Sequence, residues 1–511
     1  MPLRRWFADA SVLPGAPGLY ARTVTREDWS TALGDVAAAD GRLLALWAGG
    51  APGEAVVHAA FLAAGRGLVL ALPAGERALP FPGAASLFPA AARMQRAVAD
   101  LSGLRSTDAD QRPWLRHGSW PEGFLPLVSG AAPVPDPDPC ADDYPYVRVE
   151  GDGVHEIAVG PVHAGIIEPG HFRFSVVGEK VLRLEERLGY VHKGIERRFT
   201  ELPALAGHRL AARVSGDSAV AFSWAYCQAL EGIAGVRIEP CAAHLRALCL
   251  ELERLANHLG DLGALGNDAG FAFGLAQFLR LKEQLLRATE RALGQRYLFD
   301  AIVPGGVARD LDGSAAAELA AAVRGILVEV GALRTVYDEH EGLRDRFAGA
   351  GIVTPELAAR LGLIGLAGRA SGQALDLRVD LPGEPYDRLA ITRCIHTEGD
   401  VAARVAVRFD EVAEAGRLIA RLTATLPAGE HRVPVAPPAT AALGIGLVEG
   451  WRGPVLVALE AGPGDAIRRC HPHDPSWQNW PVLEHAIIDN IVPDFPLINK
   501  SFNLSYSGHD L

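Results

Sequence analysis

Apolar residues recur at spacings of three and four over much of the second half of the chain, a pattern typical of amphipathic helices. The clearest examples are residues 241–265, 274–299 and 398–427. Stretches of this length, joined by short connections, predict long helices packed side by side as a bundle.

Shorter apolar runs, separated by glycine and proline, are typical of strands. Residues 42–48 and 67–74 have this pattern. Residues 84–104, which follow them, predict a helix. Further along, residues 155–199 predict β-hairpins, and residues 443–462 predict a short β segment near the end of the chain.

A run in which proline and aspartate alternate, "PVPDPDP", suits neither helix nor sheet and predicts a linker over residues 131–150. We therefore expect an α+β protein of two domains. Residues 1–130 form a small α/β domain, and residues 151–511 form a mainly α-helical domain with β-hairpins at its start and a small β segment near its C-terminus.

The composition narrows the class of protein. The chain has 511 residues, 49% of them hydrophobic and 22% charged, with a formal net charge of −12. These values are typical of a soluble globular protein and argue against nucleic-acid binding. The chain contains no uninterrupted apolar run of about 18 residues, so we expect no transmembrane helix. Asp9, Pro14 and Pro17 stand where a cleaved signal has a continuous apolar core, so we expect no such signal.

The six cysteines include no Cys-x-x-Cys pair, the spacing that zinc, iron-sulfur and nickel sites favour. We expect them to be free thiols, packed as small apolar residues in a reducing compartment.

Residues 160–174, "GPVHAGIIEPGHFRF", carry the densest polar cluster, with His163, Glu168, His171 and Arg173 on a predicted loop between strands. A carboxylate beside an imidazole and a guanidinium suits proton handling. A salt-bridged turn without chemistry is the alternative.

Six segments occur in an order that resembles the large subunit of membrane-bound group 4 [NiFe] hydrogenases, as in formate hydrogenlyase, and the related 49-kDa subunit of respiratory complex I. They are "GPVHAGIIEPGHFRF", "RLGYVHKGIE", "ELERLANHLGDLG", "VPGGVARDL", "GRASGQALDLR" and "EGDVAARVAVRFDE". The resemblance covers residues 150–511, and the first 130 residues resemble a degenerate, fused copy of the complex I 30-kDa subunit.

The resemblance implies a nickel-iron centre held by four thiolates from two Cys-x-x-Cys pairs. Here the first pair reads "RVSGDS", in which Arg213 matches the family but Ser215 and Ser218 replace cysteines, and the C-terminal segment offers Ser505. A protonated alcohol is a weak ligand for nickel. We therefore predict that this chain binds no metal and is not an active hydrogenase.

In complex I, a quinone headgroup docks between a histidine, in a Gly-Pro-x-His-Pro-x-Thr-His-Gly segment, and a tyrosine. Here Gly160, Pro161 and His163 match the start of that segment, but its second histidine falls at Ile167 or Pro169. The tyrosine segment, residues 197–208, contains no tyrosine, so both polar anchors of the headgroup are missing. His163 and Arg213 are thus candidates for a vestigial cofactor pocket, with quinone as one candidate ligand.

Glu168 and His171 resemble a hydrogenase segment whose glutamate moves protons away from the metal. Together with Arg173 and Asp217 they form a candidate proton relay. Asp217 is expected to pair with Arg213 or Arg173, because an unpaired buried charge is costly. The alternative is that these groups only satisfy neighbouring polar atoms.

Two other polar segments leave alternatives open. Arg369, Asp376 and Arg378 either lie near the interface with an iron-sulfur small subunit, as the resemblance implies, or form an internal ion-pair network. His471 and His473, on a predicted proline-broken loop, suit a partner surface better than a metal site.

The resemblance implies a large subunit of a membrane-associated complex that is similar to complex I and to energy-converting hydrogenases. Such a subunit couples electron transfer to ion translocation and lies on the cytoplasmic side of the cell membrane. Its partners would be an iron-sulfur small subunit, which holds the cluster, and antiporter-like membrane subunits. The alternative is a catalytically inactive subunit that links these partners.

Overall fold

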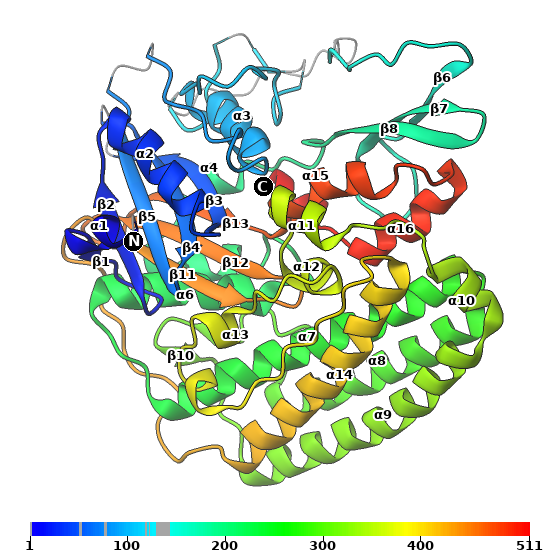
Figure 1. Ribbon diagram of the computed structural model, residues 1–511. Coiled ribbons are helices and arrows are strands. Elements are labelled where there is room, and N and C mark those ends of the chain that lie inside the picture. Colours follow the sequence, from blue (N-terminus) through cyan, green and yellow to red (C-terminus); the bar gives the residue numbers. More distant parts are fainter. Residues whose placement is uncertain (1–2, 51–53, 76–78, 118–119, 122, 129–143) are drawn as a thin grey trace.

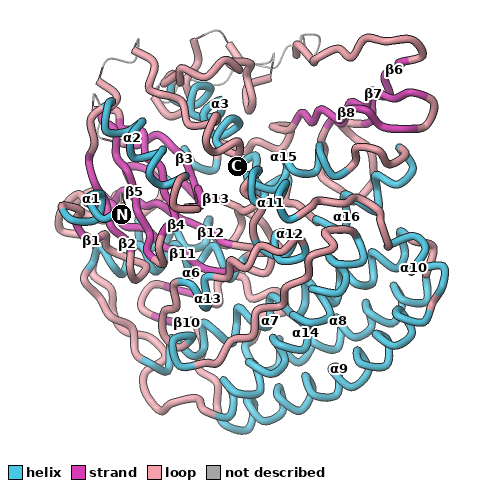
Figure 2. The backbone as a smooth tube through the Cα atoms, in the orientation of Figure 1, coloured by secondary structure: helices cyan, strands magenta, loops and turns pink. Residues whose placement is uncertain are grey.

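The computed structural model describes residues 3–50, 54–75, 79–117, 120–121, 123–128 and 144–511. Strands gather in the upper part of the molecule and long helices fill the lower part (Figures 1 and 2). The α+β fold class is confirmed. Most of the predicted linker, residues 131–150, lies outside the described residues, and residues 144–150 form neither helix nor strand.

The N-terminal part forms a five-stranded sheet in the order β1-β2-β5-β4-β3, in which β2 and β5 are parallel and the other pairs antiparallel. Its strands are β1 (Ser11–Val12), β2 (Leu19–Thr23), β3 (Arg42–Gly49), β4 (Val56–Ala63) and β5 (Arg66–Pro73). Its helices are α1 (Arg4–Ala8), α2 (Arg26–Ala37) and α3 (Ala91–Ser102). The helix predicted over residues 84–104 begins later, since Pro89 disfavours helical backbone before it.

The predicted hairpins form a three-stranded antiparallel sheet in the order β6-β7-β8. Its strands are β6 (Val154–Val159), β7 (His171–Val177) and β8 (Lys180–Arg187). It extends from the body of the molecule at the upper right of Figure 1, and the loop between β6 and β7 carries His163 and Glu168.

Long helices lie side by side below the sheets (Figure 1). They are α6 (Ala219–Ala234), α7 (Pro240–Asp268), α8 (Ala272–Leu293), α9 (Gly313–Glu339) and α14 (Val401–Ala424). Three residues account for where these helices begin or end: Pro240 opens α7, left-handed Gly294 (φ +78°) closes α8, and the Asp400 side chain caps α14. The helix predicted over residues 274–299 therefore ends earlier, at Leu293. No described helix is both long and apolar enough to cross a membrane.

The C-terminal part adds an antiparallel sheet and three helices. They are β11 (Ala442–Glu449), β12 (Pro454–Ala461), β13 (Ile467–His473), α15 (Ser476–Ala486), α16 (Phe495–Phe502) and α17 (Tyr506–Asp510). Buried residues of β3 and β4, such as Trp47 and Ala60, share a core cluster with Ile445 and Leu456 of this sheet. The N-terminal sheet is therefore packed against the C-terminal one.

Short elements connect these units. They are α4 (Ile195–Phe199), η1 (Ala204–Ala206), α5 (Gly207–Ala211), β9 (Ile302–Val303), β10 (Gly306–Val307), α10 (Glu341–Phe347), α11 (Pro355–Leu361), α12 (Gly365–Ala370), α13 (Leu377–Asp380), η2 (Tyr386–Arg388) and η3 (Val492–Asp494).

Candidate functional site

The serines at the predicted metal positions meet in space although nearly 300 residues separate them in sequence. Ser215 lies in the turn between α5 and α6, and Ser505 caps α17. Their hydroxyl oxygens are 2.8 Å apart, and both side chains are buried, as is that of Ser218. We call Ser215, Ser218, Ser505 and the two charged residues described next the serine cluster.

Asp217 forms the charged centre of this cluster with Arg452, which lies in the turn between β11 and β12. The Arg452 Nη2 atom lies 2.5 Å from Asp217 Oδ2, and Ser215 donates a hydrogen bond of 2.7 Å to Asp217 Oδ1. The prediction that Asp217 pairs with Arg213 or Arg173 is wrong. Asp217 pairs instead with Arg452, from a turn far away in the sequence, and no pattern near Asp217 indicated this pairing.

The two arginines expected there have other partners. Arg213 forms a bidentate ion pair with Asp300, with nitrogen–oxygen distances of 2.7 and 2.9 Å. Arg173 pairs with Glu156 at 2.9 Å, since the two residues sit on neighbouring strands of the hairpin sheet. Arg213 thus lies beside the serine cluster without joining it.

The environment keeps Asp217 ionised. Burial by itself would raise the pKa of its carboxyl, but the Arg452 guanidinium and the Ser215 hydroxyl together lower that pKa below its usual value. The side chain is still 36% exposed, because it borders a cavity described below. The cluster therefore presents a fixed negative charge next to a buried guanidinium.

The fourth metal position would lie three residues beyond Ser505, at Gly508. A Cβ atom added there would lie 2.7 Å from Asp474 Oδ2, so the fold has closed over this position. With Ser215, Ser218 and Ser505, the donor set is three neutral hydroxyls and a glycine. These residues do not fit a nickel-iron centre, which requires soft, anionic sulfur.

Glu168 of the hairpin loop reaches the C-terminal segment next to the cluster. Its carboxylate accepts a hydrogen bond of 3.0 Å from the backbone nitrogen of Ser507 and a short one from the Ser507 hydroxyl. In the same loop, His163 Nε2 lies 3.4 Å from the hydroxyl of Tyr506. Tyr506 was missed by the sequence argument, although it stands next to Ser505.

His171 and Arg173 lie on β7 and not on the predicted loop. The His171 ring is 5.4 Å from that of Tyr146, and the Arg173 guanidinium lies over the same ring at 4.2 Å. The four candidate relay residues therefore do not form one cluster: Glu168 and Asp217 both lie by the serines, whereas Arg173 is held within the hairpin.

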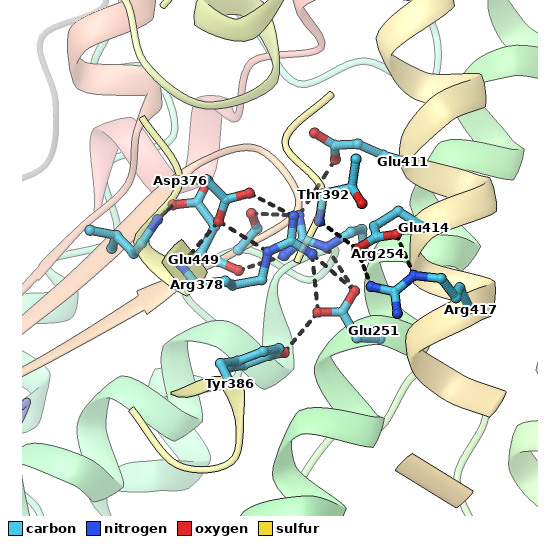
Figure 3. A network of polar contacts seen from close by, with 12 residues as sticks. Glu251, Arg254, Asp376, Arg378, Tyr386, Thr392, Glu411, Glu414, Arg417 and Glu449 are labelled. Atoms are coloured by element: carbon cyan, nitrogen blue, oxygen red, sulfur yellow. Dashed lines mark hydrogen bonds and ion pairs between the residues drawn. The ribbon is translucent and has the colours of Figure 1, made fainter. Parts of the chain in front are cut away.

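Arg369, Asp376 and Arg378 belong to an internal ion-pair network (Figure 3). Arg369 contacts Glu411 at 2.6 Å and Glu449 at 2.9 Å, and Arg378 contacts Asp376 at 2.7 Å. All five side chains are almost fully buried. Of the two alternatives, the internal network is the one that the structure contains.

His471 and His473 are also buried, so they do not form a partner surface. They lie on β13, where His471 Nδ1 is 2.6 Å from Glu196. Each of the five cysteines within the described part of the chain is a buried free thiol, as predicted.

The fold defines a large subunit of the hydrogenase and complex I type, and comparisons with known proteins agree. Residues 268–443 match the family described as respiratory-chain NADH dehydrogenase, 49 Kd subunit. Formate hydrogenlyase subunit 5 of Escherichia coli (strain K12) is 32% identical over 84% of this chain and 77% of its own length. Hydrogenase-4 component G of the same strain is 30% identical over 84% and 76%.

The chain therefore belongs to the family of formate hydrogenlyase subunit 5 and hydrogenase-4 component G. A solved chain from the membrane-bound sulfane sulfur reductase, an archaeal respiratory membrane complex, has the same fold, with a TM-score of 0.65 and 23% identity. The match covers 70% of this chain and 99% of the solved one. The predicted family is confirmed, and its members named here are subunits of hydrogenase and respiratory complexes.

Proposed function

We propose that this protein is the large subunit of a membrane-bound oxidoreductase complex, and that it couples electron transfer to ion translocation without activating hydrogen. The observation that carries the proposal is the serine cluster: the family fold is intact, while hydroxyls, a glycine and the Asp217–Arg452 pair occupy the metal positions. The chain itself holds no metal in this proposal.

The proposed partners are an iron-sulfur small subunit, which carries the cluster, and antiporter-like membrane subunits on whose cytoplasmic side this chain lies. The loop between β6 and β7 supports a partner with an apolar surface. Its residues Val162, Ile166 and Ile167 are 81%, 100% and 43% exposed, and a group of exposed apolar side chains on one loop suits contact with a partner.

A quinone is the electron acceptor that the local chemistry favours. The His163 imidazole and the Tyr506 hydroxyl face each other at 3.4 Å, and both groups hydrogen-bond carbonyl oxygens. In this proposal Tyr506 of α17 takes the place of the tyrosine that residues 197–208 lack.

The serine hydroxyls supply a proton relay in this proposal. Ser505, Ser215 and Asp217 form a continuous hydrogen-bonded row, and Glu168 joins the same C-terminal segment through Ser507. A hydroxyl accepts one proton and releases its own, so a row of hydroxyls moves charge without a metal. A purely structural subunit is the competing function, and it predicts that neither Glu168 nor any residue of this row affects turnover.

The test uses the purified membrane complex. We expect metal analysis to find no stoichiometric nickel, and we expect Glu168→Gln to lower the rate of quinone-analogue reduction at unchanged subunit composition. Glu156→Gln, a glutamate of the same hairpin that lies on β6, is the matched control and keeps full turnover. Stoichiometric nickel would refute the proposal, and equal turnover in both variants would favour the structural role.

A further inference from the structure

A cavity of about 190 Å³ lies directly behind the serine cluster. Its walls come from the α5–α6 turn (Gly216 and Asp217), from α7, from α8 and from residues 296–298. The volume is enough for several water molecules at roughly 30 Å³ each. Besides Asp217, the carboxyl of Glu253, the basic side chains of Lys282 and Arg296 and the phenol of Tyr297 line it.

Glu253 is the buried carboxyl of this cavity. Its side chain accepts hydrogen bonds from the backbone nitrogens of Val220 at 2.7 Å and Ala221 at 3.3 Å, in the first turn of α6. No arginine, lysine or histidine lies within ion-pair distance of it among the described residues. The carboxyl thus has backbone donors on one side and the cavity on the other, and no counter-ion among the described residues.

The charges around Glu253 come from each element packed against it. Asp217 faces it from the α5–α6 turn, Arg254 follows it on α7, and Lys282 and Arg296 line the same cavity. Arg254 is engaged by Glu251 at 3.1 Å and Arg296 by Glu283 at 2.5 Å, which limits their effect on the carboxyl.

We propose that Glu253 is a reversible proton-binding site of this subunit, loaded from the water of the cavity and controlled by the charge of Asp217. The proton moves between cavity water and the Glu253 carboxylate, so that the carboxylate becomes a carboxylic acid and water supplies the proton. The fixed negative charge of Asp217 raises the affinity of this site for a proton.

The electrostatics support this geometry. Burial raises the pKa of Glu253 to about 8, the two backbone donors oppose that rise, and the negative charge of Asp217 adds to it. A group with this pKa changes its protonation near neutral pH, whereas an ordinary glutamate does not.

The test is infrared spectroscopy of the full chain, which detects the carbonyl band of protonated carboxyls. We expect one band to titrate near pH 8, to shift promptly in D₂O because cavity water reaches it, and to disappear in Glu253→Gln. Protonated carboxyls elsewhere in the chain give background bands that Glu253→Gln leaves in place.

A second variant, Asp217→Asn, tests whether Asp217 sets the proton affinity of Glu253, and it remains informative even if Glu253→Gln folds poorly. In Asp217→Asn the midpoint of the same band moves to lower pH, because a negative neighbour is lost. Asp300→Asn, which removes a carboxylate from the adjoining loop, leaves the midpoint unchanged. A band that survives Glu253→Gln, or a midpoint that Asp217→Asn does not lower, overturns the proposal. Both results are independent of electron transfer and therefore of the proposed function.

Discussion

Two polar clusters lie inside this protein, and they differ in what surrounds their charges. In the centre of the network of Figure 3, Arg378 is held by Asp376 and Glu251, and Arg369 by Glu411 and Glu449. These six side chains are sealed from solvent, whereas Arg417 at the edge of the network is exposed. In the serine cluster, Arg452 is buried but Asp217 borders a cavity. A sealed ion-pair network holds the packed elements together, whereas a cluster that borders a cavity can exchange protons with water.

The largest difference between the two clusters should appear when one guanidinium is removed. Arg369→Met leaves Glu411 and Glu449 buried without that counter-charge, at a cost of about 3–5 kcal/mol in the free energy of unfolding. Arg452→Met costs less, roughly 1–2 kcal/mol, since Asp217 retains hydroxyl donors and cavity water. Chemical denaturation measures both, with the surface residue change Arg287→Met as control.

Equal losses for Arg369→Met and Arg452→Met would contradict the distinction between a sealed and a hydrated cluster.

The closure of the old metal position predicts the next effect. Gly508→Ala places a methyl group against the Asp474 carboxylate and should cost about 1–3 kcal/mol. Gly216→Ala, in the other half of the degenerate motif, is the control, because its nearest neighbour is 3.7 Å away. Thermal denaturation compares the two, and a silent Gly508→Ala would mean that position 508 is still open.

The network of Figure 3 and the cavity behind the serine cluster should respond to pH in opposite directions, through Glu411 and Glu253. The pKa of Glu411 is well below its usual value because of Arg369 and His258, although burial opposes this, so its contribution to stability is present above about pH 4.5 and lost below it. The pKa of Glu253 is raised to about 8. Its native state binds the proton more tightly, so its contribution is fully present below about pH 4.5 and is lost as pH rises through 8.

Between those limits the Glu253 contribution falls by about 1.4 kcal/mol per pH unit. We therefore expect Glu253→Gln to flatten the decline in unfolding free energy between pH 5 and pH 8, measured by urea denaturation in a pH series. Asp300→Asn should leave that slope as it is. A slope that is identical in wild type and Glu253→Gln would rule out a raised pKa at this position.

The smallest effect concerns one hydroxyl. Ser215→Ala removes the 2.7 Å hydrogen bond to Asp217 and should cost about 1 kcal/mol, with Ser215→Thr restoring most of it. Ser223→Ala, which removes a hydroxyl that bonds only to its own helix, is the control. If the two alanine variants unfold alike, the hydroxyl row adds nothing to stability.

The sequence by itself determined the elements and the family. Apolar spacing indicated α7, α8 and α14, because this signal repeats every three or four residues along one helix. It did not fix their ends: the helix predicted over residues 274–299 ends at Leu293, before Gly294. The serines at 215, 218 and 505 were also readable as lost metal positions. Each of these features depends on near neighbours in the chain.

Only the tertiary structure decided which charges meet. Arg452 reaches Asp217 from a β-turn 235 positions away, Tyr506 reaches His163 from the other end of its domain, and Glu253 faces a cavity that α7 and α8 enclose together. The choice of partner among many arginines depends on how sheets and helices pack, which sets distance and burial at once. The sequence near Asp217 contains no information on either the distance or the burial of a candidate partner. Arg213 and Arg173 were therefore predicted on charge alone, and both lie too far from the Asp217 carboxylate to pair with it.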